Sequence, residues 1–140
     1  MKMRKVGSII LIALIALIVV APAGLMAQDP KVEPPKVVGV LMYADWCSSC
    51  KVLEPKLNPV KRGFEDKPIL FTRFDLTDDF TIDQSARFAA VLGLEKLFKE
   101  NAGKTGYMAL IEWPSRRSLG VITKDETPEK IKAILSSLVK

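Results

Sequence analysis

The sequence contains no histidine and only two cysteines, Cys47 and Cys50. Without imidazole, a Cys/His nucleophile pair, a Ser/His/Asp triad and all histidine-containing metal sites are excluded. The chain also has little excess of charge, because beyond residue 27 it carries 18 basic against 16 acidic residues. Nucleic-acid-binding proteins show a clustered basic face, so this balance gives no sign of a nucleic-acid partner.

The first 27 residues contain no acidic side chain. Lys2, Arg4 and Lys5 are followed by an apolar run from Ile9 to Ala21 and then by small residues, which is the layout of a secretory signal peptide. The uncharged stretch 6–28 is also long enough for an uncleaved membrane anchor. Both interpretations place the rest of the chain in an extracytoplasmic compartment, periplasmic or cell-envelope, where disulfides persist. The membrane is a partner only in the second interpretation.

A proline-rich segment separates this start from the globular part. Residues 28–36 ("QDPKVEPPK") combine three prolines with charged side chains, which is typical of an extended linker. Residues 37–140 are long enough for one domain, and a chain that is 49% apolar can supply its core. We therefore expect a signal peptide or anchor at 1–27, a linker at 28–36 and one domain at 37–140.

The domain is predicted to have an α/β fold in the order βαβαββα. The run "VVGVLMY" is continuous, apolar and rich in β-branched residues, which is typical of a strand covered on both faces. A helical crossover makes the first two strands parallel, and a turn at 114–117 makes the last two an antiparallel hairpin, so the sheet is mixed and flanked by helices. The expected strands are Val37–Tyr43, Pro68–Leu76, Tyr107–Trp113 and Ser118–Ile122; the expected helices are 48–64 (kinked at Pro55, restarting at Asn58-Pro59), 81–104 (interrupted at Gly93) and 127–140 (capped by Thr127).

The two cysteines lie between the first strand and the first helix. A helix N-terminus favours a thiolate, so Cys47 is expected to be a solvent-facing nucleophile and Cys50, one turn further, a partly buried resolving thiol. Ser48 and Ser49 are small enough for the turn to close as disulfide or dithiol, and Lys51 adds a nearby positive charge. Two alternatives stay open: two thiolates suit a monovalent copper ion, although zinc would lack ligands, and the pair could be a structural disulfide, although so short a loop gains little stability.

The string "YADWCSSCK" at Tyr43–Lys51, with an apolar strand before it and Pro55 after it, resembles the active-site motif of the thioredoxin superfamily. The resemblance implies a thioredoxin fold and a thiol–disulfide oxidoreductase, which the signal at residues 1–27 would make an exported protein. It also implies that the partners are protein thiols and disulfides together with an upstream electron donor or acceptor protein, and that the redox-active disulfide is the only cofactor. Cys47 would be the nucleophile, Cys50 the resolving thiol, and Trp46 would flank the site.

The chain departs from this family pattern at three places. Leu41 stands where thioredoxins carry a buried acid, and the loop before the third strand has no proline where the family has a cis-proline. Thr105, Gly106 and Tyr107 are therefore the candidates for the substrate groove, and their peptide bonds are expected to be trans because a non-proline cis bond is costly. Glu95–Lys104 is an addition, which we expect to lie beside Cys47 and to restrict docking.

The sequence gives less support to other functions. A non-catalytic thioredoxin-like binding module, with the cysteines as an inert disulfide, is the alternative from another class, and a thiol-based copper carrier is a third. The acidic stretch "DLTDDFTID" does not have the spacing of a calcium loop, so we expect a solvated loop with Asp83 near a helix start and no metal site.

Overall fold

The computed structural model describes residues 33–140. The expected signal peptide or anchor and the first part of the linker lie outside the described residues. Within 33–140, no helix is both long and apolar enough to cross a membrane.

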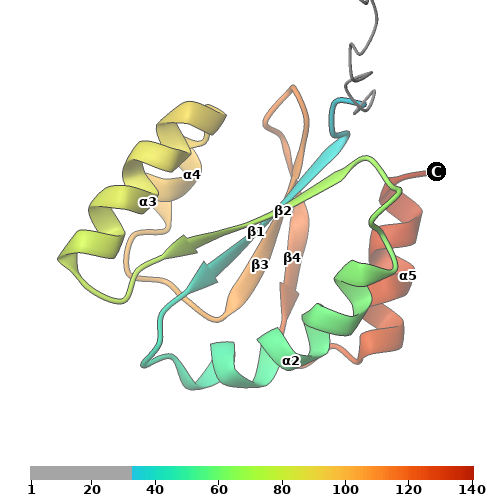
Figure 1. Ribbon diagram of the computed structural model, residues 1–140, viewed down its shortest axis with the longest axis horizontal. Coiled ribbons are helices and arrows are strands. Elements are labelled where there is room, and N and C mark those ends of the chain that lie inside the picture. The colour runs from blue at the N-terminus through green and yellow to red at the C-terminus, as the bar shows by residue number, and fades with distance from the viewer. Residues whose placement is uncertain (1–32) are drawn as a thin grey trace, which may run out of the picture. The chain divides into compact units, whose positions relative to one another are not determined.

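The described residues form a four-stranded sheet in the order β2-β1-β3-β4 (Figure 1). The strands are β1 (Val37–Tyr43), β2 (Ile69–Asp75), β3 (Tyr107–Glu112) and β4 (Ser118–Thr123). β1 pairs with β2 in parallel and with β3 in the antiparallel sense, and β3 pairs with β4 as an antiparallel hairpin. Six of the seven residues of β1 are buried because it lies inside the sheet with helices over both faces. The predicted α/β class and mixed sheet are confirmed.

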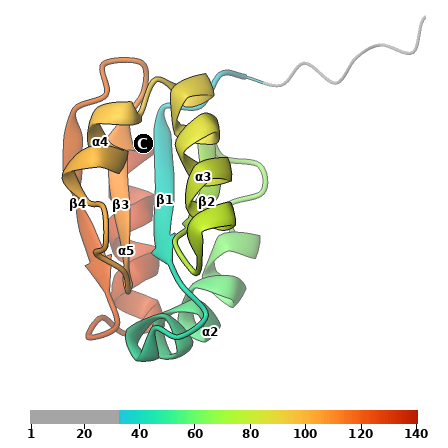
Figure 2. The same ribbon diagram turned by 90° about the vertical axis from the view of Figure 1, so that its left-hand side faces the viewer.

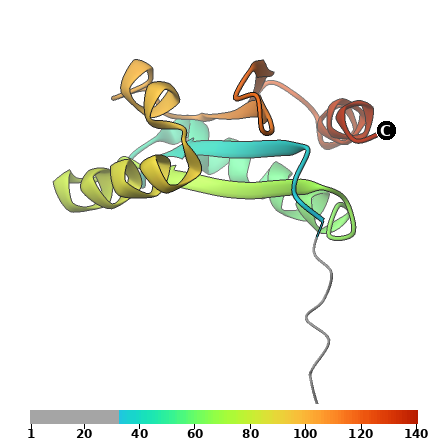
Figure 3. The ribbon, with the colours of Figure 1, turned by 90° about the horizontal axis from the view of Figure 1, so that it is seen from above.

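Four helices, counted within the described residues, cover the sheet in two groups. They are α2 (Ser48–Arg62), α3 (Asp79–Leu92), α4 (Glu95–Glu100) and α5 (Pro128–Leu138), with α3 and α4 on one face and α2 and α5 on the other (Figures 1 and 3).

Each face of the sheet carries its own core cluster. On the α3 and α4 face, Val38, Val40 and Met42 of β1 pack with Phe74 and Phe98. On the α2 and α5 face, Leu41 packs in a second cluster with residues that include Leu53, Leu57, Met108, Ile131 and Leu135. The alternation of side chains along a strand assigns neighbouring residues of β1 to opposite clusters, which explains why the whole run is apolar.

The helix boundaries differ from the sequence prediction at two points. α2 is continuous from Ser48 to Arg62 with Pro55 and Pro59 inside it, so the expected restart at Asn58-Pro59 is wrong. The expected helix 81–104 begins earlier, because Asp78 caps it through a capping box with Thr81. Gly93 then ends α3 in the left-handed conformation, with φ 65°, and α4 follows as a separate short helix.

Candidate active site

Cys47 is the N-cap residue of α2, directly after the turn that leaves β1. Its backbone is extended, with φ −77° and ψ 110°, and its Sγ accepts a hydrogen bond from the backbone N–H of Cys50 at 3.1 Å. The first turn of α2 contains no acidic residue that would oppose a negative charge there. The cap position therefore directs the unpaired N–H groups of the helix start at the Cys47 sulfur.

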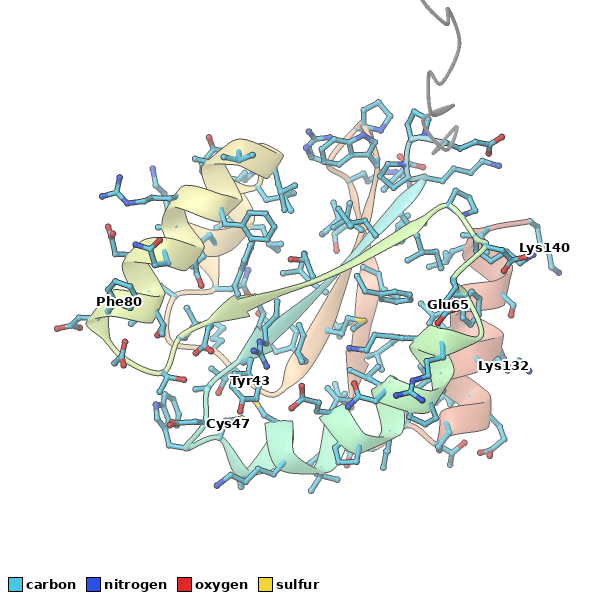
Figure 4. All side chains as sticks on the ribbon, in the orientation of Figure 1. Tyr43, Cys47, Glu65, Phe80, Lys132 and Lys140 are labelled. Carbon is cyan, nitrogen blue, oxygen red and sulfur yellow. The ribbon has the colours of Figure 1, made fainter. Side chains whose placement is uncertain are left out.

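Both cysteines are free thiols, and both are buried. Cys47 is 6% exposed and Cys50 is fully buried, and together with Ala44 they form a small cluster against which Tyr43 packs (Figure 4). The expectation that Cys47 faces solvent is wrong, because the loop before β3 lies over its sulfur.

Gly106 is the residue of that loop that comes closest to the cysteines. It has φ +91°, and a Cβ at this position would lie 3.3 Å from the Cys47 Sγ and only 2.6 Å from the Ser49 Cβ. Its N–H donates to the Met42 carbonyl at 2.8 Å, which ties the loop to the end of β1. The Cys50 thiol donates to the same carbonyl at 3.7 Å. A residue without a side chain is thus required where the loop meets α2.

The two cysteines differ in pKa. Burial raises the pKa of Cys47, but hydrogen bonds from the Cys50 thiol, the Thr105 side chain and the backbone N–H groups of Cys50 and Ser49 outweigh it, so the Cys47 pKa is lowered overall. Burial, reinforced by the hydrogen bond to Cys47, raises the pKa of Cys50 to about 11. Cys47 is therefore the thiol that ionises first, and Cys50 holds its proton.

Trp46 flanks the pair and is held from outside α2. Its side chain is 60% exposed, and its Nε1–H donates to the Thr77 carbonyl at 3.1 Å. The Asp45 N–H donates to the Thr77 Oγ1 at 3.1 Å. Thr77 was missed in the sequence analysis because its contacts reach 31 and 32 residues back along the chain, and no local pattern signals them.

The other predicted site residues divide into those the structure brings to the pair and those it does not. Ser48 and Lys51 are exposed on the first turn of α2. Thr105 and Gly106 reach Cys47, as described above. Tyr107 does not, because its side chain packs against the core cluster on the α3 and α4 face.

The added segment Glu95–Lys104 lies differently from the prediction. α4 borders a pocket with Ile111, Arg116 and Arg117, near the β3–β4 turn. Figure 2 shows α4 at that end of the sheet, whereas α2 begins at the opposite end. Only the last part of the connection into β3 reaches Cys47, so the expectation that the whole segment lies beside Cys47 is wrong.

The structure also shows what replaces the buried acid and the cis-proline of the family pattern. Leu41 is 2% exposed within the core cluster under α2, and Ser85 is the only buried polar or charged residue in the part of the chain that is described. The single cis peptide bond among residues 33–140 is Trp113-Pro114, so the bonds around Thr105 and Gly106 are trans. Within the same residues, no three histidine, cysteine or carboxylate side chains come together as a metal site would require.

The comparisons with known proteins agree with this geometry. The family model described as Thioredoxin matches residues 28–103. The chain belongs to the thioredoxin family. It is 33% identical over 49 residues to Thioredoxin-T of Drosophila melanogaster, a match that covers 34% of this chain and 31% of that protein. The matched segment thus spans about a third of that relative.

One solved structure shows the same fold at low sequence identity, and a second has a lower TM-score. The structure of MTB dsbF, in mixed oxidised and reduced forms, has a TM-score of 0.51 and 13% identity, covering 76% of this chain and 83% of that one. A mutant thioredoxin from Halobacterium salinarum has a TM-score of 0.46 and 19% identity, covering 76% and 77%. The predicted thioredoxin fold is confirmed, and this chain presents its Cys47-x-x-Cys50 pair at the N-terminus of α2.

Proposed function

We propose that this thioredoxin-family protein is a thiol–disulfide oxidoreductase that exchanges electrons with partner proteins through Cys47 and Cys50. The observation that carries the proposal is the position of Cys47 as the N-cap of α2, where its Sγ accepts the Cys50 N–H at 3.1 Å, with Cys50 fully buried one turn further. The shifts of the two thiol pKa values, downward at Cys47 and upward at Cys50, agree with this geometry. A pair in which one thiol ionises readily and the other stays protonated suits a two-step exchange, with the first as nucleophile and the second as resolving thiol.

In the first step, the Cys47 thiolate attacks one sulfur of a partner disulfide. The partner S–S bond breaks, a mixed disulfide forms at Cys47, and the second partner sulfur leaves as a thiolate that takes up a proton. In the second step, Cys50 loses its proton and attacks the Cys47 sulfur, which releases the partner as a dithiol and leaves a Cys47–Cys50 disulfide. Two electrons pass to the partner, and the same steps in reverse would oxidise a partner dithiol.

The proposed exchange needs no cofactor other than this disulfide. Each turnover leaves the pair in the other redox state, so a second protein must donate or accept two electrons before the next turnover. We place the reaction in an extracytoplasmic compartment, periplasmic or cell-envelope. The basic start and apolar run of residues 1–27 support that location.

The test is a trap for the mixed disulfide. A Cys50→Ala variant lacks the resolving thiol, so it should accumulate a covalent complex with a disulfide-bonded protein substrate, visible by non-reducing electrophoresis and lost on reduction. A Cys47→Ala variant is the matched control, and it should form no such complex because the buried Cys50 keeps its proton.

The rate of alkylation gives a second, independent measurement. Cys47 should react with iodoacetamide at neutral pH faster than a free cysteine of ordinary pKa, about 8.5. An absence of both the complex and the faster alkylation would overturn the proposal in favour of a non-catalytic binding module.

A further inference from the structure

Two large aromatic side chains are exposed, one directly before Cys47 and one in the first turn of α3. Trp46 is 60% and Phe80 72% exposed, and no other aromatic side chain in the described part of the chain is more than half exposed. Such side chains usually lie in a core or an interface, so their exposure is typical of a contact surface.

A hydrogen bond links Trp46 to the segment that carries Phe80. Trp46 is fixed by its hydrogen bond to the Thr77 carbonyl, and Phe80 lies three residues further, in the first turn of α3. The capping box between Asp78 and Thr81, with hydrogen bonds of 2.8 and 3.0 Å, fixes that turn. Figure 4 shows Phe80 and Cys47 at the same end of the molecule. We call Trp46 together with Thr77–Phe80 the β2–α3 edge.

The charge around the β2–α3 edge is negative. Asp45, Asp78 and Asp79 are exposed, and none of them forms an ion pair within residues 33–140. The exposed basic residues nearest in sequence to the two cysteines and the loop over them are Lys51 and Lys104. The chain beyond residue 27 is almost balanced in charge, so this concentration of carboxylates is a local feature.

We propose that the β2–α3 edge is the docking surface for the partner protein, and that the partner presents its reactive cysteine next to an apolar side chain and to lysine or arginine. This inference rests on the proposed function. The apolar side chain covers Phe80 and Trp46, and the basic side chains approach the carboxylates and the face of Trp46. Both contacts lie at the same end of the molecule as Cys47, so they would orient the partner disulfide for attack.

The experiment uses three synthetic peptides that share a central cysteine in a mixed disulfide with a small thiol. They differ only in the flanking residues, Leu with two Lys, Leu with two Glu, or Gly with two Ser. The rate constant of exchange with the reduced full-length protein is measured for each peptide and divided by the rate constant with a small uncharged disulfide. We expect the Leu-Lys peptide to react about tenfold faster than the Leu-Glu peptide at low salt, and the ratio to fall toward two in 0.5 M salt.

Two substitutions separate the apolar from the charged contribution. Phe80→Ser should reduce the advantage of the Leu-Lys peptide over the Gly-Ser peptide several-fold. Asp45→Asn combined with Asp79→Asn should remove most of the preference for lysine over glutamate; Asp78 is kept because it caps α3. Val91→Ser, which removes an apolar side chain that is 82% exposed on the same helix, and Glu65→Gln, an exposed carboxylate at the other end of α2, are the matched controls and should change nothing.

The outcomes are distinguishable from a failure of the proposed function. If the protein exchanges with the small disulfide but reacts equally with all three peptides, or if Val91→Ser has the same effect as Phe80→Ser, the docking proposal is overturned and the function stands. If Cys47 exchanges with no disulfide, binding of the same peptides with serine in place of cysteine, measured by calorimetry, still tests the surface. A concentration-dependent dimer that Phe80→Ser abolishes would assign the β2–α3 edge to a second copy of the chain instead.

Discussion

Cys47 and Cys50 are three residues apart, yet their surroundings favour opposite protonation states. Donors converge on Cys47 from the helix start, from Cys50 and from Thr105, whereas Cys50 is fully buried with its thiol directed to Met42 and Cys47. A negative charge is stabilised by donors and penalised by burial, so within the same small region Cys47 ionises more readily than Cys50. The difference between the two residues lies in their donors, because both are buried.

The contribution of the Thr105 hydroxyl to the lowered pKa of Cys47 can be measured separately. Thr105→Val removes the hydroxyl at nearly constant shape, so the Cys47 pKa should rise by about one unit, since a hydrogen bond to a charged group contributes about 1.5–3 kcal/mol before solvent screening. The pH dependence of the alkylation rate reports this pKa. Thr105→Ser keeps the donor and should leave the pKa within a few tenths of the wild-type value. An unchanged pKa in the valine variant would show that the hydroxyl does not act on Cys47.

At the scale of secondary-structure elements, the site is a junction between α2 and the loop that enters β3. The loop is fixed by Gly106, whose N–H donates to the β1 carbonyl of Met42. Cys47 caps α2, and the exposed Trp46 precedes it. The Trp46 indole is held by Thr77, which lies directly before the N-cap residue of α3. Three segments that are distant in sequence, residues 42–50, 77–80 and 105–106, therefore meet at this site.

A pair of glycines in this loop separates backbone strain from steric contact. Gly103 and Gly106 both have positive φ, 80° and 91°, but a Cβ at Gly103 meets nothing within 4 Å, whereas at Gly106 it would meet Ser49 at 2.6 Å. Gly103→Ala should reduce the free energy of unfolding by about 1–2 kcal/mol through strain alone and leave Cys47 reactivity unchanged. Gly106→Ala should cost more than this and should also raise the Cys47 pKa, because the loop and Thr105 are displaced.

The measurements are chemical denaturation and the alkylation rate of Cys47. A second substitution, Ser49→Gly, removes the contacting Cβ and should restore part of the reactivity of Gly106→Ala. Equal effects of the two alanine variants on Cys47 would contradict the steric argument.

At the scale of the whole molecule, the buried thiol links stability to pH. The Cys50 pKa of about 11 lies above that of an unfolded cysteine, so above about pH 8.5 the folded state keeps a proton that the unfolded state releases. The free energy of unfolding of the reduced protein should therefore fall as the pH rises from about 8.5 to 11, by about 3 kcal/mol in total. The lowered pKa of Cys47 acts in the opposite sense at lower pH, where stability rises with pH.

Urea denaturation of the reduced protein and of Cys50→Ala at pH 8.5 and pH 10 measures this effect. The wild type should lose about 2 kcal/mol more than the variant over that interval. The oxidised protein has no free thiol at either position, and it should show the shallower dependence of the variant. A wild-type curve parallel to that of Cys50→Ala would contradict the raised pKa.

The elements that are set by local pattern could be predicted from the sequence, and those set by distant contacts could not. The apolar run of β1 and the Thr127-Pro128 start of α5 were predicted closely because each depends on its own residues. The burial of Cys47 was missed because it depends on Gly106, far along the chain. The position of α4 was missed for a similar reason, since Phe98 packs into the core cluster on the α3 face, a partner that local pattern does not reveal.

Leu41 has a consequence for which molecule, this protein or its partner, provides the base that receives the Cys50 proton. It fills the space under α2 with hydrocarbon, and the described part of the chain buries no carboxylate that could receive the Cys50 proton from below. The proton must then leave toward the open side of the site, where water and the departing thiolate of the partner lie. In the proposed exchange the partner is therefore more than a substrate, because its own leaving group can act as the base that the domain does not provide.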